Sequence, residues 1–488
     1  MPIPTQQEGD IAMTRTPLAT VVGSGPNGLA AAITLAQAGC QVRVLEAEAT
    51  IGGGTRSAAL TLPGFVHDVC SAVHPLAVAS LFFRTLPLAE HGLDWIQPSA
   101  PLAHPLADGS AVMLERSMDD TSAQLGGDAM AWRKLFEPMV AAGDPLIDAL
   151  LAPLYPPRHP ITMGRFGLHA IRSARALAES RFGGKRARAL FAGIAAHAVL
   201  PLEATASASF GLVLGLLAHA GGWPIPRGGS QQIANALASY LTSLGGEILI
   251  RQRVTDAGEL DDSDLVLFDV TPRQLLSIGG ELLPARYRHR LARYQYGPAV
   301  FKLDWALHEP IPWQAAECAR GGTVHLGGTL EDIARSEHAM AHGDHAEQPF
   351  VLLTQPSLFD RSRAPAGQHT AWAYCHVPNG STFDMAERIE AQVERFAPGF
   401  GDVIAARHAS APAALEQHNA NYIGGDIVGG ANTLRQIIAR PVLSADPYAI
   451  PVKGWYLCSA STPPGGGVHG MCGYNAARSA LRSLGIPP

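Results

Sequence analysis

Paired cysteines are missing from this chain of 488 residues. Its six cysteines are scattered, and none belongs to a CxxC or CxxxxC arrangement. Isolated thiols are typical of reduced intracellular proteins, so the pattern excludes a disulfide framework and a redox-active dithiol. The 19 histidines show no metal-ligand spacing either, and we expect no metal site.

Charge and long apolar runs are also scarce. Charged residues make up 16% of the chain, the net charge is −6, and no basic domain with interleaved aromatics occurs, which argues against nucleic-acid binding. The most apolar run, residues 210–220, is too short to cross a bilayer. Residues 1–12 have neither the charged nor the apolar region of a secretory signal. We therefore expect a cytoplasmic protein with a disordered leader, residues 1–14.

The segment 158–190 departs from this balance of charge. Eight basic residues between positions 158 and 188 are opposed by the single acid Glu179, and apolar residues alternate with them. Such a segment could lie on an anionic surface, placing the protein at the inner face of a membrane. It could equally be a solvated, partly helical surface, which is common in proteins that never meet lipid. The sequence leaves both interpretations open.

The region after the leader carries a dinucleotide-binding fingerprint. A short apolar strand, 18–22, enters a glycine-rich turn, 23–28, and a helix follows it. A second strand, 41–45, ends at the acid Glu46, which is placed to accept hydrogen bonds from the adenosine ribose. Strand, turn, helix, strand and acid all occur in order, so a ligand-free glycine turn is the weaker interpretation. The pattern predicts a Rossmann-like α/β domain.

Each residue of the turn has a physical task. Gly23 allows the tight exit from the strand, and Gly25 lets the backbone approach a pyrophosphate. Gly28 lets the helix and the strand pack closely. Pro26 and Asn27 open the helix, whose free N–H groups and positive dipole end favour phosphate. We expect all five residues to contact or shape the nucleotide site.

A second glycine cluster favours FAD over a nicotinamide cofactor. Residues 51–57 read IGGGTRS and resemble the extended motif of flavoproteins of the glutathione-reductase and amine-oxidase type. In those proteins this loop runs along the FAD pyrophosphate toward the flavin. The resemblance implies FAD contacts from Gly53, Gly54, Thr55 and Arg56. A plain surface loop is the alternative.

The alternation of helix and strand stops and later returns. Helical patterns dominate from about 76 to 223, for example at 130–151 and 165–178, and a helix–strand–strand pattern then resumes. In such sheets ligands lie at the carboxyl ends of the strands, which would place Val254 near the adenine. We expect a discontinuous FAD-binding domain interrupted by an inserted α+β substrate-binding domain with a helical cover. The FAD-binding segments are predicted at 15–75, 224–292 and 441–488, and the substrate-binding segments at 76–223 and 293–440.

Two further stretches make the resemblance more specific. PRGGSQQIANALASYL (226–241) and GWYLCSASTPPGGGVHGMCGYNAARSAL (454–481) resemble the phytoene desaturase-related FAD-dependent oxidoreductases. Within that branch the chain is most similar to the bacterial relatives of pyridine nucleotide-disulphide oxidoreductase domain-containing protein 2. The resemblance implies that the last helix points its N-terminus at the flavin. It also implies contacts with the pyrophosphate and ribityl chain from Ser459 and Ser461, and with the isoalloxazine from Gly467, Val468 and Met471.

Two side chains are candidates for the redox centre. The stretch 297–313 alternates like a strand and resembles the amine-oxidase strand whose lysine is bonded through water to flavin N5. On that resemblance Lys302 is the leading candidate, with a surface lysine on an edge strand as the alternative. His469 is the second candidate, because its glycine loop is expected to face the flavin.

The family resemblance implies an FAD-dependent oxidoreductase that takes a hydride from a lipophilic small molecule such as a polyene or isoprenoid. A second glycine fingerprint does not occur, so the expected electron acceptor is oxygen, a quinone or another carrier rather than a bound nicotinamide. Three alternatives stay open: a flavin-dependent isomerase or saturase, an amine oxidase-like enzyme, and a flavin-free protein that binds prenyl groups or lipid. The sequence does not specify the oligomeric state.

Overall fold

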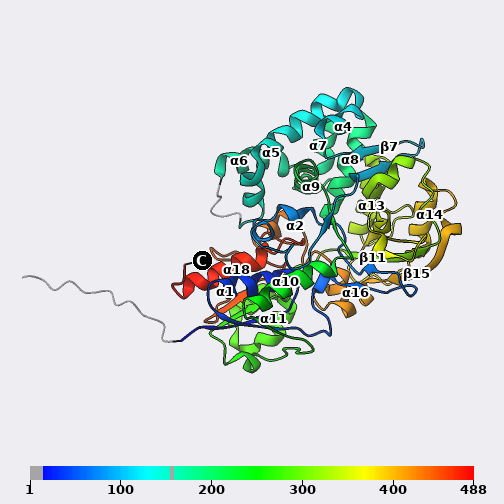
Figure 1. The fold of residues 1–488 in the computed structure, drawn as a ribbon. Coiled ribbons are helices and arrows are strands. Elements are labelled where there is room, and N and C mark those ends of the chain that lie inside the picture. Colours follow the sequence, from blue (N-terminus) through cyan, green and yellow to red (C-terminus); the bar gives the residue numbers. More distant parts are fainter. Residues whose placement is uncertain (1–14, 154–158, 488) are drawn as a thin grey trace, which may run out of the picture.

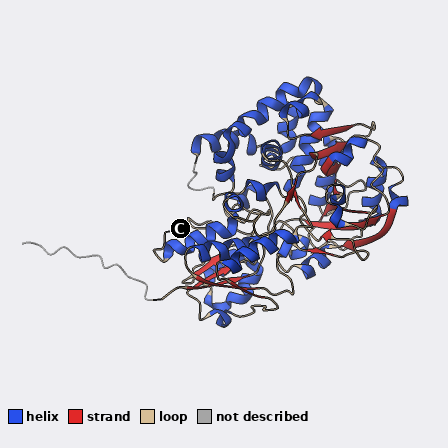
Figure 2. Ribbon diagram, viewed as in Figure 1, coloured by secondary structure: helices blue, strands red, loops and turns tan. Residues whose placement is uncertain are grey.

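The computed structural model describes residues 15–153 and 159–487. The predicted leader, 1–14, and Arg158 at the start of the basic segment lie outside the described residues. Two separate sheets organise the described part of the chain, with helices on and between them (Figures 1 and 2).

The first sheet has five parallel strands in the order β16-β10-β1-β2-β9. A parallel sheet wrapped by helices is the Rossmann-like arrangement, so the predicted α/β fold class is confirmed. The chain enters this sheet three times, near its start, near its middle and at its end. The strands are β1 (Leu18–Val22), β2 (Gln41–Leu45), β9 (Glu247–Leu249), β10 (Leu265–Phe268) and β16 (Trp455–Leu457).

Hydrophobic cores lie on both faces of this sheet, and its strands β1, β10 and β16 are largely buried, whereas β2 and β9 are partly exposed. Val21 and Leu267 pack into the core beneath α1, α10 and α18, whereas Val22 and Phe268 pack into the core beneath α11 and α12. Figure 1 shows α1, α10 and α18 gathered beside one another. These helices are α1 (Pro26–Gln37), α10 (Gln231–Ser243), α11 (Pro272–Gly279), α12 (Ala285–Leu291) and α18 (Met471–Ser483).

The second sheet is mixed and has seven strands in the order β15-β11-β14-β13-β12-β6-β7. β11 pairs with β14 on one side and β15 on the other, so Lys302 does not lie on an edge strand and the surface alternative is wrong. The strands are β6 (Ala100–Pro105), β7 (Ala111–Leu114), β11 (Ala299–Leu307), β12 (Gly321–Leu326), β13 (Val351–Thr354), β14 (His369–Val377) and β15 (Ile404–Ser410). Two short ribbons pair β3 (Ser57–Ala58) with β4 (His67–Asp68), and β5 (Trp95–Ile96) with β8 (Ile225–Pro226).

A layer of helices covers one end of the molecule, as Figure 1 shows. The prediction of one helix over 165–178 is wrong, because one helix ends at Ala170 and the next begins at Ala174. Ser173 caps a new helix there by accepting a hydrogen bond from the Ala176 N–H at 3.2 Å. The layer comprises α5 (Ala129–Leu150), α6 (Pro160–Ala170), α7 (Ala174–Arg181), α8 (Lys185–Ala195) and α9 (Ala208–Ala220).

The remaining helices connect or cover the sheets: α2 (Pro75–Ala79), α3 (Leu81–Arg84), α4 (Met118–Ala123), α13 (Leu330–Ala341), α14 (Ala386–Phe396), α15 (Phe400–Val403), α16 (Pro412–His418) and α17 (Leu434–Ile438). Within residues 15–153 and 159–487, none of the helices is both long and apolar enough to cross a bilayer. All six cysteines lie in the described part of the chain, and each is unpaired. The domain boundaries drawn from the sequence stay a prediction.

Candidate cofactor and substrate site

The glycine turn between β1 and α1 is built as its residue types require. Gly23 has a φ of +102°, a conformation that favours glycine. A Cβ at Gly28 would overlap the carbonyl oxygen of Gly23, so only glycine lets α1 start this close to the strand. α1 begins at Pro26 with no side-chain cap, and its first turn faces a cavity lined by Pro26 and Asn27.

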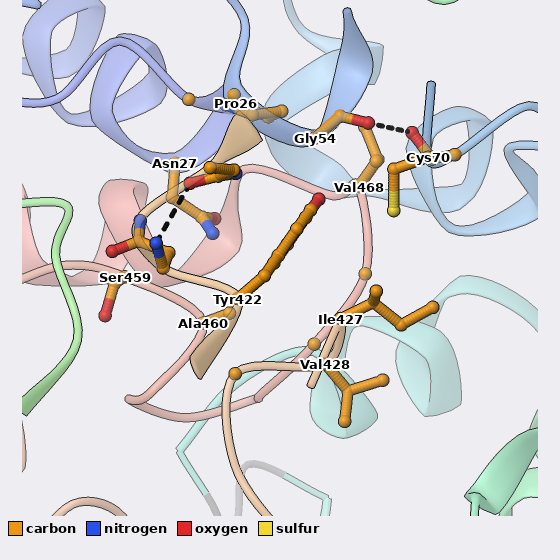
Figure 3. A pocket seen from close by; sticks show the side chains of 18 of the residues that line it. Pro26, Asn27, Gly54, Cys70, Tyr422, Ile427, Val428, Ser459, Ala460 and Val468 are labelled. Atoms are coloured by element: carbon orange, nitrogen blue, oxygen red, sulfur yellow. Dashed lines mark hydrogen bonds between the residues drawn. The ribbon is translucent and has the colours of Figure 1, made fainter. Parts of the chain in front are cut away.

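That cavity has a volume of about 710 Å³ and is lined by many segments of the chain, from residues 22–27 near its start to residues 459–469 near its end. Figure 3 shows Pro26, Asn27 and Gly54 from the N-terminal part around the same space as Ser459 and Val468 from the C-terminal part. The structure thus brings most of the predicted site residues together. The predicted residues that line the cavity are Gly23, Gly25, Pro26, Asn27, Glu46, Gly53, Gly54, Arg56, Val254, Ser459, Ser461, Gly467, Val468 and His469.

The other four predicted residues lie behind the cavity wall. Gly28 packs against the turn, and the Thr55 hydroxyl donates to the Gly52 carbonyl at 2.8 Å. Met471 is buried in the core between α18 and its neighbours. Lys302 is buried beneath Trp372, whose ring does line the cavity. These four residues support the residues that line the cavity but do not line it themselves.

Glu46 ends β2 with its carboxylate turned toward the glycine turn. Its Oε2 accepts hydrogen bonds from the Ser24 N–H at 2.9 Å and the Ser24 hydroxyl at 2.5 Å. Its Oε1 accepts the Glu48 N–H at 2.8 Å and lies 3.5 Å from a guanidinium nitrogen of Arg56. The carboxylate therefore fixes the turn and joins it to the second glycine loop.

Asp269, just after β10, was missed at the sequence level. Its carboxylate accepts the Gly28 N–H at 3.0 Å, and its side chain is only 7% exposed. Burial, and secondarily the charge of Glu46, raise the pKa of Asp269 to about 7. The available signal was an acid directly after a fully apolar strand, at the edge of the sheet where ligands bind.

The C-terminal glycine loop is held by its own polar groups. The Ser461 hydroxyl donates to the Gly429 carbonyl at 2.9 Å, and the Ser461 N–H donates to the Ser459 hydroxyl at 3.2 Å. His469 accepts the Met471 N–H at Nδ1, 3.0 Å away, so its Nε2–H donates to the Gly465 carbonyl at 3.2 Å. Burial lowers the pKa of His469 to about 4, and the ring is neutral. Both ring nitrogens hold the loop, and a catalytic role of His469 stays a prediction.

Lys302 forms a buried ion pair within its own strand. Its Nζ lies 2.5 Å from both carboxylate oxygens of Asp304, and these side chains are 2% and 0% exposed. The ammonium also lies 5.2 Å from the centroid of the Trp372 ring. Trp372 lines the cavity whereas Lys302 does not, and the place of Lys302 at the redox centre stays a prediction.

The part of the cavity farther from the glycine turn is mostly apolar. The acids of the described lining, Glu46, Glu48 and Asp269, lie at the other end of the cavity, around the glycine turn, which we call its nucleotide half. Trp372 and Thr354 are cross-strand neighbours on β14 and β13, and both present buried polar atoms without a partner in the described residues, Nε1 and Oγ1. Most of the other side chains of this wall are apolar, among them Leu150, Leu151, Val199, Phe210, Val213, Leu214, Leu352, Leu353 and Ile427.

One histidine pair reaches this apolar part and was also missed at the sequence level. His197 lines the cavity, and its Nε2 lies 2.9 Å from Nε2 of the fully buried His325. One proton is therefore shared between the two nitrogens. Burial lowers the pKa of His197 to about 3, so the pair is neutral at rest. The two residues are 128 positions apart, and no local pattern links them.

The sequence and the fold were compared with known proteins. Residues 21–82 match the family model for an NAD(P)-binding Rossmann-like domain. Pyridine nucleotide-disulfide oxidoreductase domain-containing protein 2 of Rattus norvegicus is 27% identical, covering 96% of this chain and 93% of that protein. Phytoene dehydrogenase of Streptomyces griseus is 26% identical, covering 74% of this chain and 72% of that protein.

The solved structures show the same fold at low sequence identity. An oxidoreductase from Methanosarcina mazei superposes with a TM-score of 0.65 at 16% identity, covering 95% of this chain and all of that chain. Putrescine oxidase bound to putrescine gives a TM-score of 0.62 at 18% identity, covering 96% and 99%. The predicted resemblance and the predicted fold are both confirmed.

Proposed function

From the homology of this chain to pyridine nucleotide-disulfide oxidoreductase domain-containing protein 2 and to phytoene dehydrogenase, we propose that it is an FAD-dependent oxidoreductase acting on an apolar small molecule. The observation that carries the proposal is that one continuous cavity extends from the glycine turn at Gly25 to an apolar chamber around Leu214 and Leu352. A dinucleotide at one end would present its reactive ring to a substrate at the other.

The residues of the nucleotide half suit FAD. The two glycine loops meet at the cavity wall, since a Cβ added at Gly53 would sit 3.3 Å from the Gly25 Cα, and both glycines expose backbone to the space where a pyrophosphate would lie. The buried Oδ1 of Asn27 has no partner among the described residues, although Asn27 lines the cavity. A polar ligand would satisfy this atom, since buried acceptors rarely stay unpaired. Glu46 and Val254 would hold the adenosine end, and Ser459 to Val468 the flavin end.

Bound FAD supplies acceptance of two electrons as a hydride. The chain's own task is to exclude water and to align a C–H bond of the substrate. Apolar residues of α9 and β13 perform both tasks. The neutral His197–His325 pair, joined by the 2.9 Å contact between its Nε2 atoms, places a polar group beside the apolar residues, where it would orient the substrate. Oxygen, a quinone or another carrier would then reoxidise the cofactor.

The distribution of charge favours an apolar substrate over a cationic amine. The carboxylates that line the cavity, Glu46, Glu48 and Asp269, lie in its nucleotide half, so an ammonium group in the chamber would find no counter-ion among the described residues. A polyene or isoprenoid would bury its chain against leucine and aromatic side chains instead.

The proposal is tested on the purified full-length chain. We expect yellow protein whose cofactor, released by denaturation, co-elutes with FAD in chromatography. Anaerobic addition of isoprenoid or polyene candidates should bleach the flavin absorbance, whereas mono- and diamines should not. A colourless protein that FAD cannot reconstitute would overturn the proposal and favour a flavin-free lipid-binding role. Turnover without net flavin reduction would indicate an isomerase or saturase.

Replacing Glu46 with alanine is expected to weaken FAD retention by about 1–3 kcal/mol, because the Ser24 and Glu48 N–H groups lose their acceptor. The measurement is the flavin fluorescence released into the filtrate during graded dilution. Glu46→Gln is the matched control, since its amide oxygen can still accept one of these N–H groups and should restore part of the affinity. Equal retention in wild type and both variants would remove Glu46 from the site.

A further inference from the structure

α6 exposes an apolar face to solvent. Ile161 and Leu168 are 74% and 73% exposed, and Ile171, at the C-terminal end of the helix, is 55% exposed. Spacings of seven and three residues put these three side chains on one side of a helix. Single exposed apolar side chains are common on protein surfaces. Three large ones on the same side of one short helix form an apolar patch, which is typical of an interaction site.

The charge around this patch is positive. Arg165 is exposed on the same side of α6, between Ile161 and Leu168, and the helix contains no Asp or Glu. Arg181 and Lys185 are exposed on the helices that follow. The broader basic surface expected from the sequence is reduced, because four of its arginines bind acceptors of the protein itself: Arg172, Arg175, Arg186 and Arg188.

The patch lies one helix away from the apolar chamber. α6 packs against α5 and α9. Leu150 and Leu151 at the end of α5, and Phe210 and Val213 of α9, line the chamber on their other side. Figure 1 places α6 at the outer rim of the helical layer. Contact of this face of α6 with a lipid bilayer would therefore place the chamber close to apolar molecules dissolved in the bilayer.

We propose that the face of α6 formed by Ile161, Arg165, Leu168 and Ile171 docks on an anionic lipid bilayer. The three apolar side chains enter the boundary between headgroups and acyl chains, and Arg165 binds lipid phosphate. The complementarity of apolar and cationic groups with such a surface selects this partner. The docking deepens the proposed function by naming the bilayer as the source of the apolar substrate, and it rests on that function for this consequence alone.

The test is co-sedimentation of the full-length protein with vesicles of phosphatidylcholine alone or mixed with phosphatidylglycerol. We expect binding to the anionic vesicles that weakens at high salt. Ile161→Ser/Leu168→Ser should weaken it about tenfold or more, because the two most exposed apolar side chains of the face no longer enter the bilayer. Arg165→Gln should weaken it about fivefold, since one surface cation contributes about 1 kcal/mol.

The matched control is Ile250→Ser/Leu282→Ser, which removes two exposed apolar side chains elsewhere, 44% and 58% exposed. This control should sediment like wild type. Equal binding of the α6 variant and wild type, or no binding of wild type, would overturn the proposal. A dimer in size-exclusion chromatography that the α6 variant converts to monomer would assign the face to a second copy instead. Bound flavin, measured on the same samples, reports separately on the proposed function.

Discussion

Replacing Lys302 with methionine is expected to lower the free energy of unfolding by about 3–5 kcal/mol, because it leaves the carboxylate of Asp304 buried without its cation. Asp304 is fully buried on a central strand, so water cannot replace the ammonium. His67 lies 3.6 Å from the same carboxylate but compensates poorly, since burial, the largest cause of its lowered pKa, disfavours its charged form even without Lys302. The measurement is urea unfolding followed by tryptophan fluorescence.

The double variant Lys302→Met/Asp304→Asn separates charge from packing. It removes both charges at nearly constant volume, and we expect it to recover most of the lost stability. A double variant as unstable as Lys302→Met would contradict the ion-pair explanation. The same proteins test the redox-centre prediction, because slowed flavin reduction in a stable double variant with normal FAD content would place Lys302 near the reacting atoms. Normal reduction would leave it a structural residue behind Trp372.

Changing Asp269 to asparagine is expected to alter how stability depends on pH. The unfolded carboxyl titrates near 3.8, whereas in the folded protein its pKa is about 7. Between these pH values the folded state keeps a proton that the unfolded state has released, so the stability of wild type falls as the pH rises from about 4 to about 7. The difference corresponds to at most about 4 kcal/mol, and it stays constant above pH 7. Asparagine removes this contribution.

The measurement is the difference in unfolding free energy between Asp269→Asn and wild type from pH 4 to pH 8. We expect the difference to grow in favour of the variant up to about pH 7 and then to level off. Asp261→Asn, which removes an acid from an exposed turn, serves as the control. A flat profile for Asp269→Asn would mean that the carboxyl ionises normally against Gly28. The neutral side chain should also hold the pyrophosphate at least as well, since a negative charge behind the glycine turn repels phosphate.

The nucleotide half could be predicted from the sequence because its information is local. β1, α1, β2 and Glu46 follow one another within a few dozen residues, and each leaves a periodic or glycine signal. The break between α6 and α7 was missed although Ser173 signals a helix start, because the apolar period continues across it. β6 and β7 were missed because they are short and lie inside a mostly helical segment.

The substrate half could not be predicted, because its parts meet only in the folded chain. His197 follows α8, whereas His325 belongs to β12, and the pair exists because the helical layer packs on the second sheet. Asp269 lies 241 residues beyond Gly28 and contacts it only because β10 packs beside β1 in the folded protein. Lys302 was identified as unusual, and its partner Asp304 lies two residues along the same strand, but Trp372 reaches the pair only through the pairing of β11 with β14. Contacts of this kind carry no periodic signal.

The packing of α18 on α1 has a consequence for biosynthesis. A Cβ at Gly473, in the first turn of α18, would overlap the carbonyl oxygen of Asn27, so the last helix closes directly on the opening glycine turn. A nascent chain therefore has its fingerprint exposed long before the residues that finish its wall leave the ribosome. The wall beside the glycine turn is therefore complete only once α18 has packed on α1, and a chain that lacks α18 leaves this wall open.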